Sequence, residues 1–229
     1  MKRLGIGVGV EQGFAGHCPG ALIDLKRMYS RASAKGVKVV TLLDEFTELS
    51  ILHGVFVNTV EQLAPGDLLL LGYSGHGGDK KDLSGDEPGG RDQYMCLHRE
   101  PLTDDVVWHM LEQVPARVRI AWICDCCHAG SMYRGGTDRV FHGVQLGARS
   151  GFKGELLYFG GSTDDRLSYG DANGGYWWNA IYAMVDRYSG LTWRNLYDHV
   201  AEQMPWYQKP VVAKIGEVSD AFLDLPVCL

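Results

Sequence analysis

Two short, almost uninterrupted apolar runs restrict the fold of this chain more than any other feature. Residues 67–73 and 118–124 each have the length of a strand, and each leads into a polar or glycine-rich segment. Runs of this length and composition are typical of strands buried within a sheet. They are far shorter than the roughly 20 apolar residues that a membrane-spanning helix requires. The chain is therefore predicted to fold around buried strands.

Predicted helices alternate with predicted strands along the rest of the chain. Apolar residues recur at helical spacing in 21–33, 47–63, 102–114, 176–188 and 192–204, and further strands are predicted at 4–10, 37–43, 155–159 and 210–215. Thr103 is the predicted N-cap of the third helix. Residues 75–90, rich in Gly, Asp and Lys, are predicted to form a loop. This alternation predicts an α/β fold with a mostly parallel sheet.

Composition and charge exclude several classes of protein. Of 229 residues, 45% are hydrophobic and 22% are charged, which is ordinary globular usage and excludes a disordered or fibrous chain. The net charge of −6 argues against nonspecific nucleic-acid binding, which needs clustered Lys and Arg. The six cysteines are expected to be free thiols. No signal peptide or membrane anchor is recognisable, so a cytoplasmic location is expected.

Two segments that directly follow the most apolar strands carry the candidate chemistry. His76 lies between glycines after the first strand, and Cys127 follows the second. Chemistry in such sheets collects at the carboxyl ends of the strands. A thiol attacks carbonyl carbon as the thiolate, and a neighbouring imidazole accepts its proton. Alternation along the strand predicts that Asp125 and Cys127 share one face, with Cys124 and Cys126 on the other.

Other interpretations of the same residues are weaker. Taken alone, Cys127 is more typical of a buried structural thiol. A zinc cluster of Cys124, Cys126, Cys127 and His128 lacks the paired spacings of structural zinc sites. Gly5, Gly7 and Gly9 do not have the spacing of a nucleotide-binding loop. Trp177, Trp178 and Tyr182 fit the core face of a helix.

Four short motifs in this order resemble those of metacaspases, the caspase-like cysteine peptidases. Residues 73–77 read Tyr-Ser-Gly-His-Gly, and residues 125–130 read Asp-Cys-Cys-His-Ala-Gly, with Ala129 where the family has Ser. Residues 20–25 and 160–165 are similar to two further family motifs. The resemblance implies a caspase-like three-layer α/β/α sandwich with a mostly parallel central sheet. It also implies one domain over residues 1–229, in which a large-subunit-like part (about 1–135) and a small-subunit-like part (about 154–229) are joined by a flexible stretch (about 130–153).

The resemblance also implies roles for individual residues. Cys127 corresponds to the nucleophile and His76 to the general base and later acid, with the backbone amides of Gly77 and Cys127 as the oxyanion hole. Asp24, Ser74 and Asp125 correspond to an acidic specificity pocket. Carboxylates at the base of a pocket favour a guanidinium or ammonium group. Cleavage is therefore expected after Arg or Lys.

Calcium and self-cleavage are two further family properties with counterparts in this sequence. The acidic calcium ligands of metacaspases correspond to Asp92, Asp104 and Asp105, but Arg134 stands at the fourth position. A cation among the ligands opposes binding of Ca²⁺, so calcium is a doubtful activator and the chemistry itself is expected to need no cofactor. Candidate self-cleavage sites are Arg134, Arg139, Arg149 and Lys153.

The sequence thus predicts a cysteine endopeptidase that hydrolyses peptide bonds after Arg or Lys through a Cys-His dyad and an acyl-enzyme thioester. The expected partners are protein or peptide substrates, not nucleic acid or membrane, and the expected state is a monomer. Two alternatives stay open. One is a catalytically silent caspase-like module that binds a partner protein, and the other is a peptide ligase or transpeptidase that uses the same dyad.

Overall fold

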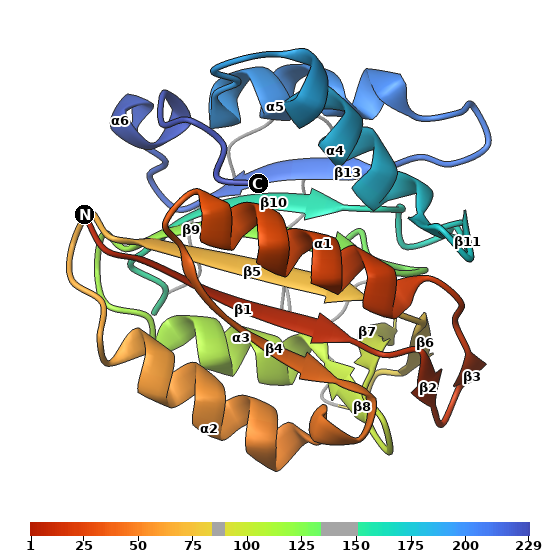
Figure 1. Cartoon of the computed structure of the whole chain (residues 1–229). Helices are drawn as coiled ribbons and strands as arrows, with labels where there is room; N and C mark the ends of the chain where they lie inside the picture. The colour runs from red at the N-terminus through yellow and green to blue at the C-terminus, as the bar shows by residue number, and fades with distance from the viewer. Residues whose placement is uncertain (84–89, 134–150) are drawn as a thin grey trace.

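A six-stranded sheet forms the centre of the molecule. The computed structural model describes residues 1–83, 90–133 and 151–229 (Figure 1). The strand order is β13-β10-β9-β5-β1-β4. The strands are β1 (Arg3–Gly9), β4 (Lys38–Leu43), β5 (Leu68–Ser74), β9 (Arg119–Asp125), β10 (Glu155–Gly160) and β13 (Val211–Ile215). Five are parallel, and β13 alone runs antiparallel, beside β10. The predicted mostly parallel sheet is confirmed.

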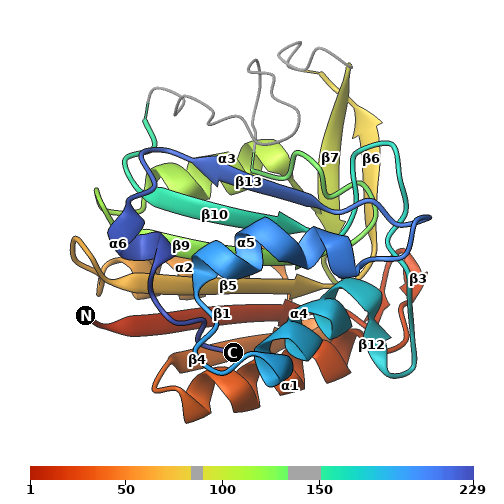
Figure 2. The same cartoon turned by 90° about the horizontal axis from the view of Figure 1, so that it is seen from above.

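Helices cover both faces of this sheet and complete three layers. On one face lie α1 (Ala21–Ala34), α4 (Tyr176–Arg187) and α5 (Trp193–His199), and on the other lie α2 (Leu49–Val60) and α3 (Asp104–Glu112) (Figures 1 and 2). The helix predicted over 47–63 spans only Leu49–Val60, because Glu48 before it is extended; a 3₁₀ turn, η1 (Asp44–Phe46), comes earlier. Thr103 stands at the N-cap of α3, but its side chain accepts no capping hydrogen bond. The three-layer α/β/α prediction is confirmed.

The central strands are buried on both faces. Leu69 packs into the core beneath α2 and α3, whereas Leu68 and Leu70 pack into the core beneath α1 and α4. Burying each such leucine contributes about 1.5–3 kcal/mol. Trp177 and Trp178 are fully buried and belong to the second core, as their helical spacing predicts. Apolar side chains on both faces hold β5 and β9 rigidly at the centre of the molecule.

The segment predicted as a loop after His76 is partly a strand. A second sheet contains β6 (Gly77–Lys81), β7 (Arg91–Cys96) and β8 (Pro101–Thr103), all antiparallel. The prediction of a loop over 75–90 was wrong for β6. Its residues Gly-Gly-Asp-Lys-Lys lack apolar alternation, so the strand depends on backbone pairing with β7. Residues 84–89 lie outside the described residues.

Short elements complete the chain. They are β2 (Gln12–Gly13), β3 (Gly16–His17), β11 (Gly170–Asp171), β12 (Gly174–Gly175), η2 (Val200–Gln203) and α6 (Asp220–Leu223). The predicted connecting stretch over 130–153 falls largely outside the described residues, as do Arg134, Arg139 and Arg149. Parts of the chain before and after this stretch contribute strands to one sheet, where β10 pairs with β9.

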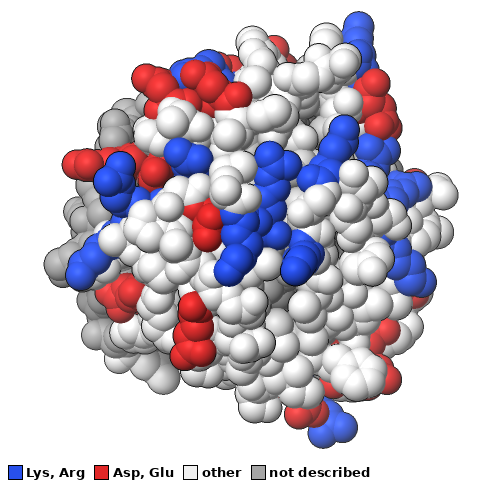
Figure 3. Space-filling model, turned by 60° about the vertical axis from the view of Figure 1, so that its left-hand side comes forward, with Lys and Arg blue, Asp and Glu red and all other residues white. Residues whose placement is uncertain are grey.

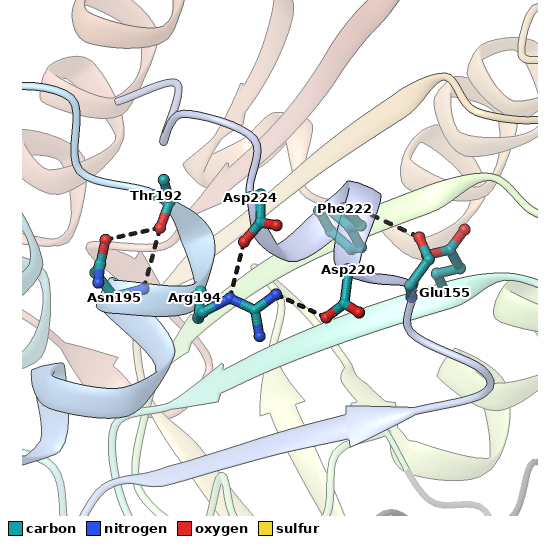
Figure 4. A network of polar contacts seen from close by, with 8 residues as sticks. Glu155, Thr192, Arg194, Asn195, Asp220, Phe222 and Asp224 are labelled. Atoms are coloured by element: carbon teal, nitrogen blue, oxygen red, sulfur yellow. Dashed lines mark hydrogen bonds and ion pairs between the residues drawn. The ribbon is translucent and has the colours of Figure 1, made fainter.

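Polar contacts fasten the C-terminal segment to the rest of the molecule (Figure 4). Arg194 of α5 donates hydrogen bonds to Asp224 (2.8 Å) and Asp220 (2.7 Å), which flank α6. The backbone N–H of Ser219 and its hydroxyl both donate to Glu155 Oε2, at 2.8 and 2.6 Å. Glu155 begins β10, so α6 is held against the start of that strand. Because the ion pairs of Arg194 are exposed to solvent, they contribute little to stability.

Charged side chains of both signs lie on the side of the molecule from which the sheet strands start. Figure 3 shows Lys and Arg side chains gathered near the middle of this face, with Asp and Glu around them. The carboxyl ends of β5 and β9 point away from this charged face, towards β6, β7 and β12 (Figures 1 and 2).

Among the described helices, none is both long enough and apolar enough to span a bilayer.

Candidate active site

The two segments with the predicted nucleophile and base meet where β5 and β9 end side by side. Ser74 pairs in register with Asp125, and Gly75 N–H donates to the carbonyl oxygen of Asp125 at 3.3 Å. A Cβ atom added at Gly77 would lie 2.2 Å from the carbonyl oxygen of Cys127. The backbones are therefore in direct contact, and only glycine fits at position 77.

A cavity of about 240 Å³ opens at this edge of the sheet. Its lining includes His76 and Cys127, together with Ser74 and Asp125 from the predicted specificity pocket. Cys18, Ser168 and Gly175 also line it, although no sequence pattern pointed to them. The structure thus brings a thiol, an imidazole and a carboxyl group to one cavity.

Backbone and side-chain contacts fix the position of His76. Its Nε2 lies 3.2 Å from the carbonyl oxygen of His17, which can only accept a hydrogen bond. Nε2 must therefore carry a proton, and in the neutral ring Nδ1 is then the nitrogen that accepts one. The hydroxyl of buried Tyr73 lies 2.7 Å from the carbonyl oxygen of His76. Because β5 supports Tyr73, the base is held by a core strand.

The thiol of Cys127 is half-buried and is in contact with Ser168. The backbone N–H of Ser168 donates to Cys127 Sγ at 3.4 Å. Burial raises the pKa of the Cys127 thiol above its ordinary value, and the nearby Asp125 adds to the rise, whereas the Ser168 N–H opposes it. In the described part of the chain, no hydrogen bond joins His76 to Cys127 directly, as is common before substrate binds. At neutral pH this thiol needs a base to react.

The two acidic residues of the predicted pocket occupy different depths. Asp24 on α1 is fully buried, and its Oδ2 accepts hydrogen bonds from the Ser74 hydroxyl (2.8 Å) and the Gly175 N–H (2.9 Å). Its Oδ1 has no hydrogen-bond partner among the described residues. Asp125 lines the cavity, and it accepts hydrogen bonds from the Ser168 hydroxyl and, at 3.4 Å, from Trp178 N–H.

Both carboxyl groups are harder to ionise than an ordinary aspartic acid. Burial, reinforced by the negative charge of Asp125, raises the pKa of Asp24 to about 8. Burial raises the pKa of Asp125 to about 6, although hydrogen bonds from Ser168 and Trp178 favour its charged form. Two buried carboxyl groups that repel one another are stabilised when a cation comes between them or near them.

Sequence patterns gave no indication of four residues that shape this site. Ser168 contacts both Cys127 and Asp125, and Gln208 contacts Ser168. Gly174 and Gly175 lie against the carboxylates of Asp24 and Asp125. All four lie outside the motifs, and Gly174, Gly175 and Gln208 are also distant from them in sequence. A glycine pair at residues 174–175, just before a helix, was the one available signal.

Substitution of Gly175 by alanine is expected to destabilise the pocket. A Cβ there would lie 2.0 Å from Asp125 Oδ2 and 3.4 Å from Asp24 Oδ2. Because φ is −67° at Gly175, the cost arises from this clash and not from the backbone. Overpacking of this kind costs about 1–3 kcal/mol, so the midpoint of thermal unfolding should fall.

Gly54→Ala is the matched control. A Cβ at Gly54 meets nothing within 4 Å, and the residue lies in the exposed part of α2. Alanine there should stabilise the protein by about 0.5–1 kcal/mol. If Gly175→Ala unfolds at the same temperature as the wild type, the close approach to the two carboxylates is contradicted.

The thiols of Cys124 and Cys126 pack together in the core, although Cys126 also contributes to the lining of the cavity. Cys124 Sγ and Cys126 Sγ lie 3.7 Å apart, and Cys124 also contacts Met95. The predicted alternation of faces is therefore confirmed. His128 is in the left-handed region (φ 58°), and its Nδ1 lies 2.5 Å from the carbonyl oxygen of Asp164. These contacts indicate a structural role for His128.

The acidic residues compared with calcium ligands are engaged with protein groups. Asp92 Oδ2 lies 3.7 Å from Lys80 Nζ. The two carboxylate oxygens of Asp104 accept hydrogen bonds from the backbone N–H groups of Gln93 and Asp105. Within residues 1–83, 90–133 and 151–229, no group of three His, Cys, Asp or Glu side chains is placed to hold a metal ion. Arg134, at the fourth position, lies outside the described residues, so the expectation about calcium stays a prediction.

Comparisons of sequence identify relatives of this chain. Residues 43–134 match the family profile described as metacaspase, peptidase C14 domain. Metacaspase-1 of Coccidioides immitis is 33% identical over 147 residues, which cover 57% of this chain and 32% of that protein. Metacaspase-2 of Arabidopsis thaliana is 30% identical over 154 residues, which cover 58% of this chain and 37% of that protein. The chain therefore spans about a third of the length of these two relatives.

Comparisons of structure extend the likeness to almost the whole chain. A protein from Geobacter sulfurreducens has a TM-score of 0.80 at 23% identity, and the match covers 99% of this chain and 100% of that one. Caspase-1 from Spodoptera frugiperda has a TM-score of 0.61 at 14% identity, covering 96% of this chain and 92% of that one. At these identities the likeness shows the fold, which is caspase-like. The sequence match over residues 43–134 and the caspase-like fold make this chain similar to the metacaspases.

Proposed function

We propose that this protein is a cysteine endopeptidase that hydrolyses peptide bonds after Arg or Lys. The observation that supports this most is the shared cavity. Cys127 and His76 line it, and Asp125 and Ser74 line the same space, with buried Asp24 behind Ser74. A bound Arg or Lys side chain would reach the carboxyl groups while its own carbonyl carbon stays beside the thiol.

Cleavage begins with attack of Cys127 Sγ on the carbonyl carbon of the Arg or Lys residue. His76 accepts the thiol proton, and a new S–C bond gives a tetrahedral intermediate. The backbone N–H groups of Gly77 and Cys127 stabilise the charge that develops on its oxygen. The C–N bond then breaks, and His76 returns its proton to the leaving amine. The product of this half-reaction is a thioester between Cys127 and the N-terminal part of the substrate.

Water completes the reaction. His76 removes a proton from a water molecule, the hydroxyl oxygen attacks the thioester carbonyl, and the S–C bond breaks. The sulfur of Cys127 recovers a proton and the carboxylic acid product leaves. In this proposal neither half-reaction requires a metal or organic cofactor, because the thiol and the imidazole supply the nucleophile and the base.

The selectivity for Arg and Lys follows from the two buried carboxyl groups. A guanidinium or ammonium group that enters the cavity favours their ionised forms, because opposite charges attract strongly where water is excluded. An Asp side chain would instead add a third carboxylate to Asp24 and Asp125. Among the residues that line the described cavity, no Lys or Arg is present to balance it.

Initial rates on fluorogenic peptides test the proposal. Peptides that end in Arg, Lys or Asp are compared at one concentration, with a calcium and a chelator arm for each. We expect turnover after Arg and Lys, none after Asp, and little change with chelator. Hydrolysis after Asp, or no hydrolysis of any peptide by the monomeric chain, would contradict the proposal. A product joined to an added amine in place of a free acid would indicate a transpeptidase.

A further inference from the structure

Gln208 lies beside the candidate active site and is held by three hydrogen bonds. It is 2% exposed and belongs to the segment between η2 and β13. Its Nε2 lies 2.8 Å from the carbonyl oxygen of Gly161 and 2.8 Å from Ser168 Oγ. Its Oε1 accepts from the backbone N–H of Tyr169 at 3.1 Å. Both polar atoms of this side chain therefore contact residues 161–169, the segment that carries Ser168.

Backbone groups determine which way the Gln208 amide faces. The Tyr169 N–H can only donate, so the atom opposite it must be the amide oxygen. The Gly161 carbonyl can only accept, so the atom opposite it must be the amide nitrogen. An inverted amide would place two donors together at one end and two acceptors at the other. The second proton of Nε2 is thereby directed at Ser168 Oγ.

This orientation in turn determines where the Ser168 hydroxyl sends its proton. A hydroxyl has one proton to donate. Because Ser168 Oγ accepts a hydrogen bond from Gln208, its own proton is left for Asp125 Oδ1, with which it is in hydrogen-bond contact. The three residues form a chain of donors that runs in one direction, from Gln208 through Ser168 to Asp125.

We infer that Gln208 is a positioning residue that, through Ser168, holds Asp125 as a hydrogen-bond acceptor at the wall of the cavity. A carboxylate that only accepts is the form that binds a cation. The consequence for Arg and Lys selectivity rests on the proposed function, whereas the donor chain itself does not. Gln208 touches neither the thiol nor the imidazole, so it acts on the substrate only through Ser168 and Asp125.

Several other groups act on Asp125 from the elements packed around it. Trp178 N–H from α4 donates to its Oδ2, and Gly75 N–H donates to its carbonyl oxygen. The titratable groups near it or on the same cavity are Asp24, Cys18, His76, Cys126 and Cys127. The negative charge of Asp125 contributes to the raised pKa of Asp24. The donor chain is therefore tested by substitutions of Ser168 and Gln208 that leave the titratable groups around Asp125 unchanged.

Four single variants and one double variant separate the effect of the donor chain from the effects of simple charge and of packing. Ser168→Ala removes the donor to Asp125, and Ser168→Thr keeps a hydroxyl. Gln208→Glu replaces the donor by a carboxylate, which draws the Ser168 proton away from Asp125. Gln203→Glu makes the same chemical change at an exposed position in η2. The double variant Ser168→Ala/Gln208→Glu tests whether the two residues act on Asp125 through one another.

The readout is the titration midpoint of Asp125, followed by ¹³C NMR of aspartate-labelled protein and assigned with Asp125→Asn. In Ser168→Ala and Gln208→Glu the midpoint should rise by about one pH unit or more, since a hydrogen bond to the charged form is lost. Ser168→Thr should restore it, Gln203→Glu should leave it unchanged, and the double variant should show less than the sum of the single effects.

Each alternative result has a defined meaning. An unchanged midpoint in Ser168→Ala, or additive effects in the double variant, would overturn the donor chain. On peptide substrates, Gln208→Glu should lower kcat/KM for Arg peptides about tenfold near neutral pH, mostly through KM, and move the acid limb of the pH profile upward. If the wild type cleaves no peptide, the proposed function fails, but the NMR midpoints still decide the donor chain.

Discussion

Hydrolysis of Arg and Lys peptides is expected to fall to background when Cys127 is replaced by alanine. The substitution removes the atom that forms the thioester, so the remaining groups can only polarise the substrate. His76→Ala keeps the thiol but removes the base, and kcat should fall by about 10²- to 10⁴-fold. Because burial raises the pKa of the Cys127 thiol, little thiolate is present at neutral pH without His76. Initial rates at saturating substrate measure both effects.

Cys126→Ala is the matched control, one residue away. Cys126 is 2% exposed and its thiol packs against Cys124 Sγ in the core, although the residue also lines part of the cavity. Its removal should cost about 1 kcal/mol of stability and leave most of the activity. The assignment of Cys127 as the nucleophile is wrong if Cys127→Ala retains activity or if Cys126→Ala loses it while folded.

Asp24→Asn should remove much of the dependence of stability on pH in this protein. Burial and the charge of Asp125 raise the pKa of Asp24 to about 8 in the folded state. Between pH 4 and pH 8 the folded protein therefore holds a proton that the unfolded chain has lost. Stability falls as pH rises wherever the folded state binds more protons. The wild type should be more stable at pH 5 than at pH 8.5.

The expected size of this effect is large because one unit of pKa shift corresponds to about 1.4 kcal/mol. Thermal unfolding of the wild type should shift down by about 5–10 °C between pH 5 and pH 8.5, and Asp125 contributes in the same direction with a pKa of about 6. In Asp24→Asn most of this shift should disappear, together with hydrolysis of Arg peptides.

Asp198→Asn provides the comparison for the stability measurement. Asp198 is exposed on α5, so the same substitution changes net charge without relieving burial. Its unfolding temperature should follow that of the wild type at each pH. If the unfolding temperature depends on pH equally in the wild type and in Asp24→Asn, the pKa of Asp24 is not raised in the folded protein. That result would contradict the electrostatic description of the pocket.

The sequence predicted the sheet and the central cavity because both depend on local patterns. Apolar runs at 67–73 and 118–124 can only be accommodated as buried strands, and parallel strands bring their carboxyl ends to one edge. His76 and Cys127 follow those strands directly, so their convergence needed no further information. The alternation that separates Cys124 and Cys126 from Asp125 and Cys127 is likewise a property of any extended strand.

The features that were missed depend on contacts between distant segments. Strand β6 has no apolar pattern of its own and exists because β7 pairs with it. Ser168 lines the cavity and Gln208 lies behind it, and both side chains are placed from loops by hydrogen bonds to groups far away in sequence. Gly175 is required by the two carboxylates that it touches, which only the folded structure brings together. No local pattern encodes these contacts.

Covalent labelling tests the central claim most directly, namely that Cys127 and the carboxyl groups serve one Arg- or Lys-binding cavity. The protein is treated with equal concentrations of peptidyl chloromethyl ketones that end in Arg or in Asp, and the adduct is located by intact mass and peptide mapping. The account predicts one adduct, on Cys127, formed with the Arg reagent much faster than with the Asp reagent, and slowed by Asp125→Ala. Equal rates with the two reagents, or an adduct on Cys18 or Cys126 instead, would contradict it.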